Sequence, residues 1–239
     1  QLKLKDGVAL DHEAEPTVDV QVTTTDVGGL SLSESFTITV ADANEAPSDI
    51  QLSNATVAEN AAGAVIGSLS TVDPDAGDNH SYAVSDARFE VVGGQLKLKD
   101  GVALDHESEP TVTVEVTATD AGGLSRTEAF AVTVTDVSEA PTGISLSNAT
   151  VAENAAGAVV GLLTTADADA GDTHTYTVSD ARFEVVAGQL KLRAGVVVDH
   201  EALSGSTISL TVTSTDTAGH AVAQDFLIQI ENFAPSLAA

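Results

Sequence analysis

Alternation of apolar and polar residues is the strongest pattern along the chain. In residues 111–119 every second residue is Val or Ala, and the residues between them are Thr or Glu. A period of two with one apolar face predicts a β-strand that is buried on one side. The same alternation recurs in residues 18–22, 130–134, 208–212 and 226–230. We therefore expect an all-β protein.

Shorter segments support the same fold class. Residues 89–92 and 95–98 are strand-like and flank Gly93-Gly94, which predicts a β-hairpin with a glycine turn. Helical periodicity is absent from the sequence. Residues 59–64, Glu-Asn-Ala-Ala-Gly-Ala, have some helical propensity, but the segment is short and contains a glycine. We expect it to form a loop.

The pattern repeats along the chain. Pro47 recurs as Pro141 and Gln1 recurs as Gln95, with an offset of 94 residues in both cases. A period of this length is that of a small domain rather than of a solenoid turn. We predict the C-terminal half of one unit in residues 1–46, a complete unit in 47–140 and a third unit in 141–239. About seven short strands per unit, separated by Gly, Asp and Asn turns, predict tandem Greek-key β-sandwiches arranged end to end.

Composition adds a strong acidic balance. The chain has 36 acidic and 9 basic residues and a formal net charge of −27, which excludes nucleic acid and anionic membranes as electrostatic partners and favours cations. There is no cysteine, so these small units need a staple other than disulfides, and a bound metal is the obvious candidate. No apolar run reaches the roughly 20 residues that a membrane helix needs. Because the sequence begins in mid-repeat, we interpret it as a piece of a longer array.

Acidic residues gather in the predicted loops and at strand ends of the complete unit. They occur at residue 59, in the run Asp-Pro-Asp-Ala-Gly-Asp-Asn at 73–79, at 105–107, at 120 and at 136–139. Calcium takes six to eight oxygen ligands at about 2.3–2.6 Å, and an Asp-x-Asp spacing places two carboxylates on the same side of an extended chain. Thiolates are absent and histidines are few. The donor types therefore favour a hard cation over zinc.

With these motifs, the repeating unit resembles a cadherin repeat, most of all the bacterial cadherin-like repeats of adhesin-type surface proteins. The resemblance covers the whole chain. It implies that Ca²⁺ ions lie between consecutive repeats. The upstream repeat then supplies ligands from a Glu-Asn motif, a Leu-Asp-x-Glu motif and the linker, and the downstream repeat supplies them from Asp-x-Asp and Ala-x-Asp.

The resemblance implies one ligand set for each junction. The ligands implied for the first junction are Asp11, Glu13, Asp42, Asn44, Glu45, Asp73, Asp75 and Asp120. Those implied for the second are Glu59, Asp105, Glu107, Asp136, Glu139, Asp167, Asp169 and Asp216. Several positions depart from the family pattern: His106 replaces the usual Arg, Ser138 stands where Asn44 supplies an oxygen, and Thr173 replaces Asn79.

A simpler interpretation exists for each of these residues. A lone Asp-x-Asp is more often turn chemistry than a metal site. Seven or eight carboxylates at one junction would instead repel one another without a cation and raise each other's pKa values, which favours metal binding. His12, His106 and His200 lie between predicted ligands, so alternation should turn them outward as solvated spacers rather than zinc ligands. We expect Tyr82 and Tyr176 to pack at the edge of the core.

The leading hypothesis is a segment of an extracellular or cell-surface protein whose repeats are spacer and adhesion modules rigidified by calcium. The alternative is a recognition module that binds carbohydrate or another copy of the chain through a sandwich face or loop. Two tyrosines offer little surface for stacking on sugar. An enzyme is not expected, because the sequence has no cysteine, no histidine placed beside a serine nucleophile and no phosphate-binding loop.

Overall fold

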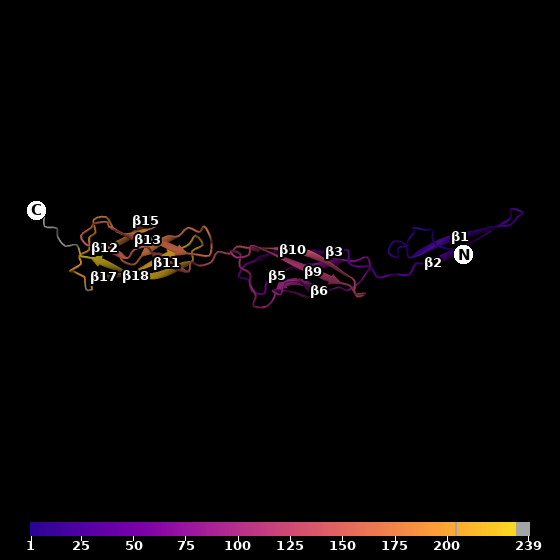
Figure 1. Ribbon diagram of the computed structural model, residues 1–239, viewed down its shortest axis with the longest axis horizontal. Coiled ribbons are helices and arrows are strands. Elements are labelled where there is room, and N and C mark those ends of the chain that lie inside the picture. Colours follow the sequence, from indigo (N-terminus) through magenta and orange to yellow (C-terminus); the bar gives the residue numbers. More distant parts are fainter. Residues whose placement is uncertain (204, 233–239) are drawn as a thin grey trace. The chain divides into compact units, whose positions relative to one another are not determined.

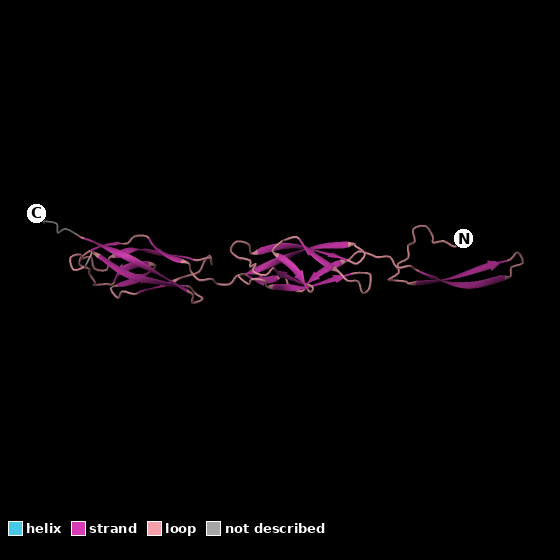
Figure 2. Cartoon of the chain, turned by 90° about the horizontal axis from the view of Figure 1, so that it is seen from below, coloured by secondary structure: helices cyan, strands magenta, loops and turns pink. Residues whose placement is uncertain are grey.

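Strands and turns make up the whole of the chain that the structure describes. The computed structural model describes residues 1–203 and 205–232, and Figure 2 shows strands and loops within these ranges. The chain divides into two compact units, Gln1–Thr135 and Asp136–Ala239, and each is described here by itself. The prediction of an all-β protein is confirmed.

Unit 1 contains a complete β-sandwich (Figure 1). Its strands are β3 (Asp49–Leu52), β4 (Thr56–Ala58), β5 (Val65–Val72), β6 (Ser81–Val84), β7 (Phe89–Val92), β8 (Gln95–Leu98), β9 (Thr111–Thr119) and β10 (Ser125–Thr135). One sheet has the order β3-β5-β8-β7 and the other β4-β10-β9-β6. The pair β4–β10 is parallel, and the other pairs in the two sheets are antiparallel. The expected hairpin is β7–β8.

The core of this sandwich is the apolar face predicted from alternation. Val114 and Val116 of β9 are fully buried, and they belong to the same cluster as Phe89 and Leu96 of the opposite sheet. Because these side chains alternate with polar ones, each strand presents a single face to the core. Tyr82 is partly buried against the cluster, as expected, and its hydroxyl lies 2.7 Å from that of Thr71.

The sandwich has eight strands where the sequence predicted about seven. The first strand of the sandwich is split between the two sheets, because β3 pairs with β5 in one sheet while β4 pairs with β10 in the other. Asn54 lies between β3 and β4, where the chain passes from one sheet to the other. Its side-chain amide donates hydrogen bonds to the carbonyls of Thr56 (2.9 Å) and Ile66 (2.7 Å). Gly67 lies in an irregularity of the β5–β8 pairing, where a Cβ would lie 2.6 Å from the Asn54 carbonyl oxygen.

Unit 2 repeats this arrangement. Its strands are β11 (Gly143–Leu146), β12 (Thr150–Ala152), β13 (Val159–Ala166), β14 (Thr175–Val178), β15 (Phe183–Val186), β16 (Gln189–Leu192), β17 (Thr207–Thr215) and β18 (Ala221–Glu231). The sheets have the orders β11-β13-β16-β15 and β12-β18-β17-β14. Phe183 and Leu190 are fully buried in its core, and Tyr176 packs against that core as expected. The boundaries 47–140 and 141–239 stay predictions.

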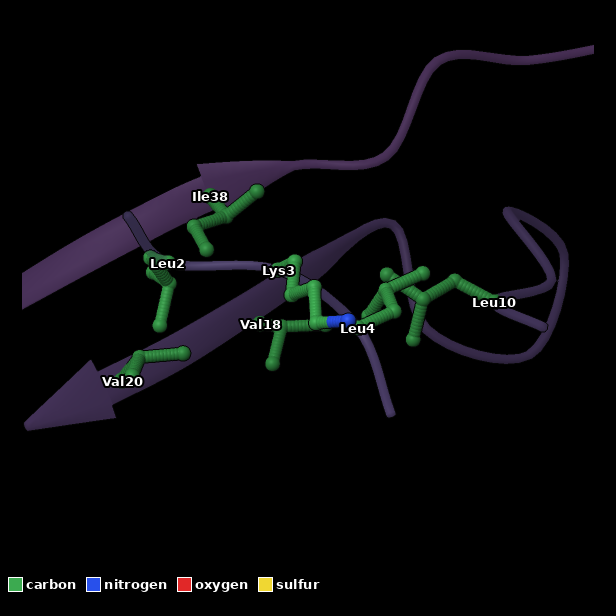
Figure 3. Close-up of a pocket in the computed structure, with 7 residues that line it drawn as sticks. All are labelled: Leu2, Lys3, Leu4, Leu10, Val18, Val20 and Ile38. Carbon is green, nitrogen blue, oxygen red and sulfur yellow. The ribbon is translucent and has the colours of Figure 1, made fainter. Parts of the chain in front are cut away.

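The N-terminal part of unit 1 has an open apolar face. Strands β1 (Thr17–Thr25) and β2 (Ser31–Thr39) form a two-stranded sheet. Residues including Leu2, Leu4, Val18 and Ile38 line a cavity of about 320 Å³ (Figure 3). Leu2 is 59% exposed, whereas its counterpart Leu96, one repeat later, is fully buried. The same apolar pattern is therefore covered in the complete repeat and uncovered in the partial one.

Candidate metal centres

The loop between β5 and β6 carries the first group of predicted ligands. Asp73 follows β5, and its side chain is only 4% exposed. One carboxylate oxygen accepts a hydrogen bond from the Asp75 backbone N–H (3.1 Å), and the other accepts one from His80 Nε2 (2.7 Å). Asp75 Oδ2 accepts a hydrogen bond from the backbone N–H of Glu45 (2.8 Å). This loop is thus tied to the linker that precedes β3.

Asp120 directly follows β9 and lies beside the same linker. Its residue is 6% exposed, and Asn44 Nδ2 donates a hydrogen bond to its Oδ2 at 3.0 Å. Burial alone would raise the pKa of the Asp120 carboxyl, but hydrogen bonds from Asn44 and from the backbone N–H groups of Leu124, Gly123 and Gly122 lower it below its ordinary value. The carboxylate form is therefore favoured at this position.

Asp78, which was not predicted as a ligand from the sequence, lies close to Asp73 and Asp120. Asp73, Asp78 and Asp120 each place a carboxylate oxygen within 4.8 Å of the others. Asp78 Oδ2 is buried and has no hydrogen-bond partner among the described residues. The signal was present in the sequence as the third acidic residue of the run at 73–79, but the family pattern has no carboxylate ligand there.

The remaining predicted ligands of this junction lie at the end of the partial repeat. Glu13, Asp42, Glu45 and Asp75 place carboxylate oxygens within 4.8 Å of one another. Asp11 Oδ1 accepts a hydrogen bond from the Glu13 backbone N–H at 2.9 Å and so shapes this loop.

Two glutamates of this group, Glu13 and Glu45, have raised pKa values. The pKa of Glu45 is raised first by burial and then by the charges of neighbouring acidic residues, and that of Glu13 is raised by burial and by a hydrogen bond with Asp11. No Lys or Arg among the described residues forms an ion pair with either side chain.

The donor chemistry of unit 1 fits a hard divalent cation. Carboxylates from the partial repeat, the linker and the complete repeat converge, and an opening of about 310 Å³ is lined by Asp42, Asn44, Asp75, Ala76 and Asp78. The predicted ligands here all offer oxygen, as calcium and magnesium prefer, although a ring nitrogen of His12 lies near Glu13 and Asp42. The unpartnered oxygen of Asp78 and the raised pKa of Glu45 are both features that a cation would relieve.

The far end of the complete repeat carries three predicted ligands of the second junction. Glu59 follows β4 and is 3% exposed, and its Oε2 accepts a hydrogen bond from the backbone N–H of His106 (2.8 Å). Asp105 Oδ1 accepts a hydrogen bond from the Ser108 N–H at 3.2 Å, and Glu107 is exposed. Glu59 is thus placed beside the loop that holds Asp105 and Glu107.

Unit 2 holds the other predicted ligands of that junction. The backbone N–H of Glu139 donates to Asp169 Oδ2 at 2.8 Å, which reproduces the bond between Glu45 and Asp75. Asp167 accepts a hydrogen bond from His174 Nε2 at 2.8 Å, as Asp73 does from His80.

Two predicted ligands of unit 2, Asp216 and Asp136, differ in the exposure of their side chains. Asp216 is 6% exposed and accepts hydrogen bonds from the backbone N–H groups of Gly219 and His220; these bonds lower its pKa although burial opposes them. Asp136 is exposed at the start of the unit.

The prediction that the spacer histidines are solvated is wrong for His12 and His106. Both are half-buried, and their Nδ1–H groups donate to the backbone carbonyls of Val40 (2.9 Å) and Val134 (2.7 Å). The hydrogen bond to Val40 is also the main reason that the pKa of His12 is raised. A ring nitrogen of His12 also lies within 4.8 Å of carboxylate oxygens of Glu13 and Asp42, so the histidine does not face away from these predicted ligands. Alternation alone could show neither this proximity nor the backbone carbonyls that accept the histidine hydrogen bonds.

Comparison with curated proteins gives two human relatives. The chain is similar to human Protocadherin-16, with 35% identity over 147 residues, and to human Protocadherin beta-1, with 27% identity over 245 aligned residues. These matches cover 56% and 92% of this chain but only 4% and 30% of the relatives. No family model matches the sequence.

Solved structures give the fold. The extracellular repeats EC1-4 of PcdhgB3 superpose with a TM-score of 0.68 at 24% identity, covering 95% of this chain and 60% of that one. Mouse Cadherin-23 EC22-24 gives a TM-score of 0.69 at 19% identity, with 95% and 78% covered. The protein therefore has the fold of tandem cadherin extracellular repeats. Within the described residues, no helix is long and apolar enough to cross a membrane.

Proposed function

We propose that the chain is a segment of an extracellular, cell-surface adhesion protein, and that its cadherin-like repeats are spacers stiffened by calcium at their junctions. The observation that carries the proposal is the first junction. There, Asn44 and Glu45 of the linker are hydrogen-bonded to Asp120 and Asp75 of the following repeat. These bonds support the proposal because they hold proposed ligands of the linker beside proposed ligands of the following repeat.

The proposed ligands of the first junction are those predicted from the resemblance, with Asp78 added. They are Asp11, Glu13, Asp42, Asn44, Glu45, Asp73, Asp75, Asp78 and Asp120. For the second junction, Glu59, Asp105 and Glu107 of unit 1 are proposed to act together with Asp136, Glu139, Asp167, Asp169 and Asp216 of unit 2. The repeated bond between a linker glutamate and a loop aspartate supports the same design at both.

The mechanism follows from charge and from linker length. Bound calcium supplies positive charge and oxygen coordination sites. Without it, Glu13, Asp42 and Glu45 lie close to one another and to Asp75, and each charged form destabilises the others. Their repulsion favours conformations in which the linker leaves the loop, whereas neutralisation favours the one in which the linker is docked. In this mechanism, the junction is stiff when calcium neutralises the carboxylates and flexible when their charges repel one another.

Self-association is the second candidate. One structurally similar protein, protocadherin gammaB7 EC3-6, was solved as a cis-dimer; it has a TM-score of 0.67, 22% identity and coverage of 94% of this chain and 60% of that one. Sedimentation of the chain with calcium and with EDTA would separate the two roles. A monomer at all concentrations would leave the spacer role alone, and a calcium-dependent dimer would favour self-association.

Calorimetric titration with Ca²⁺ tests the proposal directly. We expect saturable binding with dissociation constants on the order of 10⁻⁴–10⁻³ M, as in extracellular calcium modules. Asp75→Asn keeps an oxygen acceptor for the Glu45 N–H but removes a negative charge, so it should weaken the first junction. An absence of heat and of any calcium-dependent change in thermal unfolding would overturn the proposal.

A further inference from the structure

The turn that follows β9 has a space at Gly122 that the linker fills. Asn44 Nδ2 donates hydrogen bonds to Asp120 Oδ2 (3.0 Å) and to the Glu45 carbonyl (3.2 Å), which fixes the amide over the turn. A Cβ built at Gly122 would lie 2.6 Å from that nitrogen and nearer still to the other amide atoms. A side chain at position 122 and the docked Asn44 are therefore mutually exclusive.

Backbone conformation does not explain this glycine. Gly123, the next residue, has a φ of +91° and so needs the freedom of glycine, but Gly122 is not among the described residues with positive φ. Alanine would fit the backbone at Gly122. What the position lacks is room beside Asn44.

At the corresponding positions of unit 2, both Asn44 and Gly122 are replaced by other residues. Asp216 corresponds to Asp120, since both are 6% exposed at the end of a long strand, and Gly219, with a φ of +97°, corresponds to Gly123. The residue between them that matches Gly122 is Ala218. The linker residue that matches Asn44 is the shorter Ser138. One position gains a methyl group while the other loses an amide, so the combined size of the pair is kept.

We propose that these positions form size-matched pairs, Asn44 with Gly122 and Ser138 with Ala218, that determine which linker each repeat accepts. The first turn accepts a long linker side chain, and the second is matched to a short one. Consecutive repeats are then not interchangeable, and the order of repeats in the array is specified at its junctions. This inference rests on the proposed function, because Asn44 and Asp120 are also proposed calcium ligands.

The effect of a mismatch follows from the contacts. Gly122→Ala forces the Asn44 amide to rotate away, which breaks its hydrogen bond to Asp120 and removes its oxygen from the ligand set. Asn44→Ser loses the same bond but leaves no overlap. The double variant places a serine opposite an alanine, which is the combination at the second junction, so the overlap caused by the added methyl group is relieved.

The test is a double-mutant cycle in the full 239-residue chain, with calcium affinity and thermal unfolding as readouts. Gly122→Ala should weaken calcium binding at the first junction roughly 10–100-fold, the range for groups that orient ligands. Adding Asn44→Ser should restore much of that loss. Gly28→Ala is the matched control: it lies in the corresponding turn of the partial repeat, where an added Cβ meets only the Asp26 side chain, at 3.2 Å. It should leave calcium affinity unchanged.

Two results would overturn the pairing: wild-type affinity in Gly122→Ala, or a double variant as weak as Gly122→Ala alone. Failure of the proposed function is recognised separately, as an absence of calcium binding in the wild type. The pairing is then judged from thermal unfolding in EDTA, where steric overlap acts without the ion. A lower melting temperature in Gly122→Ala that Asn44→Ser restores would support it, and a loss without restoration would refute it.

Discussion

Removing one proposed ligand should reduce the stabilisation that calcium gives to unit 1. At about 10 mM Ca²⁺, a site with a dissociation constant on the order of 10⁻⁴–10⁻³ M stabilises the folded state by about 1.4–2.7 kcal/mol. For a domain of about 60–100 residues, the size range of the sandwich in unit 1, 1 kcal/mol shifts the melting temperature by about 4–8 °C. We therefore expect unit 1 of the wild type to melt roughly 6–20 °C higher with calcium than with EDTA.

Asp75→Asn should lose a large part of this shift. The amide keeps an oxygen that accepts the Glu45 N–H, so the loop keeps its 2.8 Å bond, but one charge is lost from a group of four carboxylates within 4.8 Å. A tenfold weaker site gives up about 1.0–1.3 kcal/mol of linked stabilisation at this calcium concentration, or roughly 4–10 °C. Glu115→Gln, an exposed change in the middle of β9, is the control and should keep the full shift.

Differential scanning calorimetry with calcium and with EDTA measures both variants. In EDTA, Asp75→Asn should unfold at or slightly above the wild-type temperature, because it removes one repelling charge. An equal calcium shift in wild type and Asp75→Asn would refute this ligand assignment. A large destabilisation of Asp75→Asn in EDTA would show instead that the residue supports the fold.

Three further predictions follow from contacts in unit 1. Leu96→Ala should lower the free energy of unfolding by about 2–5 kcal/mol in denaturant titrations, because Leu96 is fully buried. Leu2→Ala, at the counterpart that is 59% exposed, should change the free energy of unfolding by less than about 1 kcal/mol. Equal effects of the two substitutions would contradict the assigned cores. The pKa of Asp86 is lowered chiefly by its hydrogen bonds from Arg88, so this stabilisation is present above the unfolded-state value of about 3.9 and is lost as pH falls through the lower folded-state value. The melting-temperature deficit of Arg88→Gln should accordingly shrink below about pH 4, and a deficit independent of pH would argue against an ionic role. His80→Ala should weaken calcium binding and His80→Gln should weaken it less, because His80 Nε2 is hydrogen-bonded at 2.7 Å to the carboxylate of Asp73, a proposed ligand. Unchanged calcium affinity of His80→Ala in titration calorimetry would exclude this positioning role.

The fold was predictable wherever a local pattern determines the structure. Alternation in residues 111–119 identified a strand with one buried face, and Gly93-Gly94 identified the hairpin turn. The split of the first strand was not predictable, because it depends on Asn54 bonding to Ile66, twelve residues away.

Some residues of the candidate site were also predictable from local motifs, whereas others were not. The family resemblance pointed to Asp73, Asp75 and Asp120, and the structure places them in the loops that follow β5 and β9. Asp78 was missed because the motif has no carboxylate ligand at that position, although in the structure its carboxylate lies near those of Asp73 and Asp120, two proposed ligands. The role of Gly122 depends on a contact with Asn44 of the linker, which is distant in the sequence, and no local pattern reveals it.

Solution scattering with calcium and with EDTA at matched ionic strength tests the central claim most directly. If calcium stiffens the junctions, its removal should leave the far-ultraviolet circular dichroism of the sandwiches unchanged, while the maximum dimension becomes shorter and more broadly distributed. Monovalent salt should only partly reverse this change, because it screens the junction carboxylates without coordinating them. Superimposable scattering curves would contradict the account and would mean that calcium is not the stiffener.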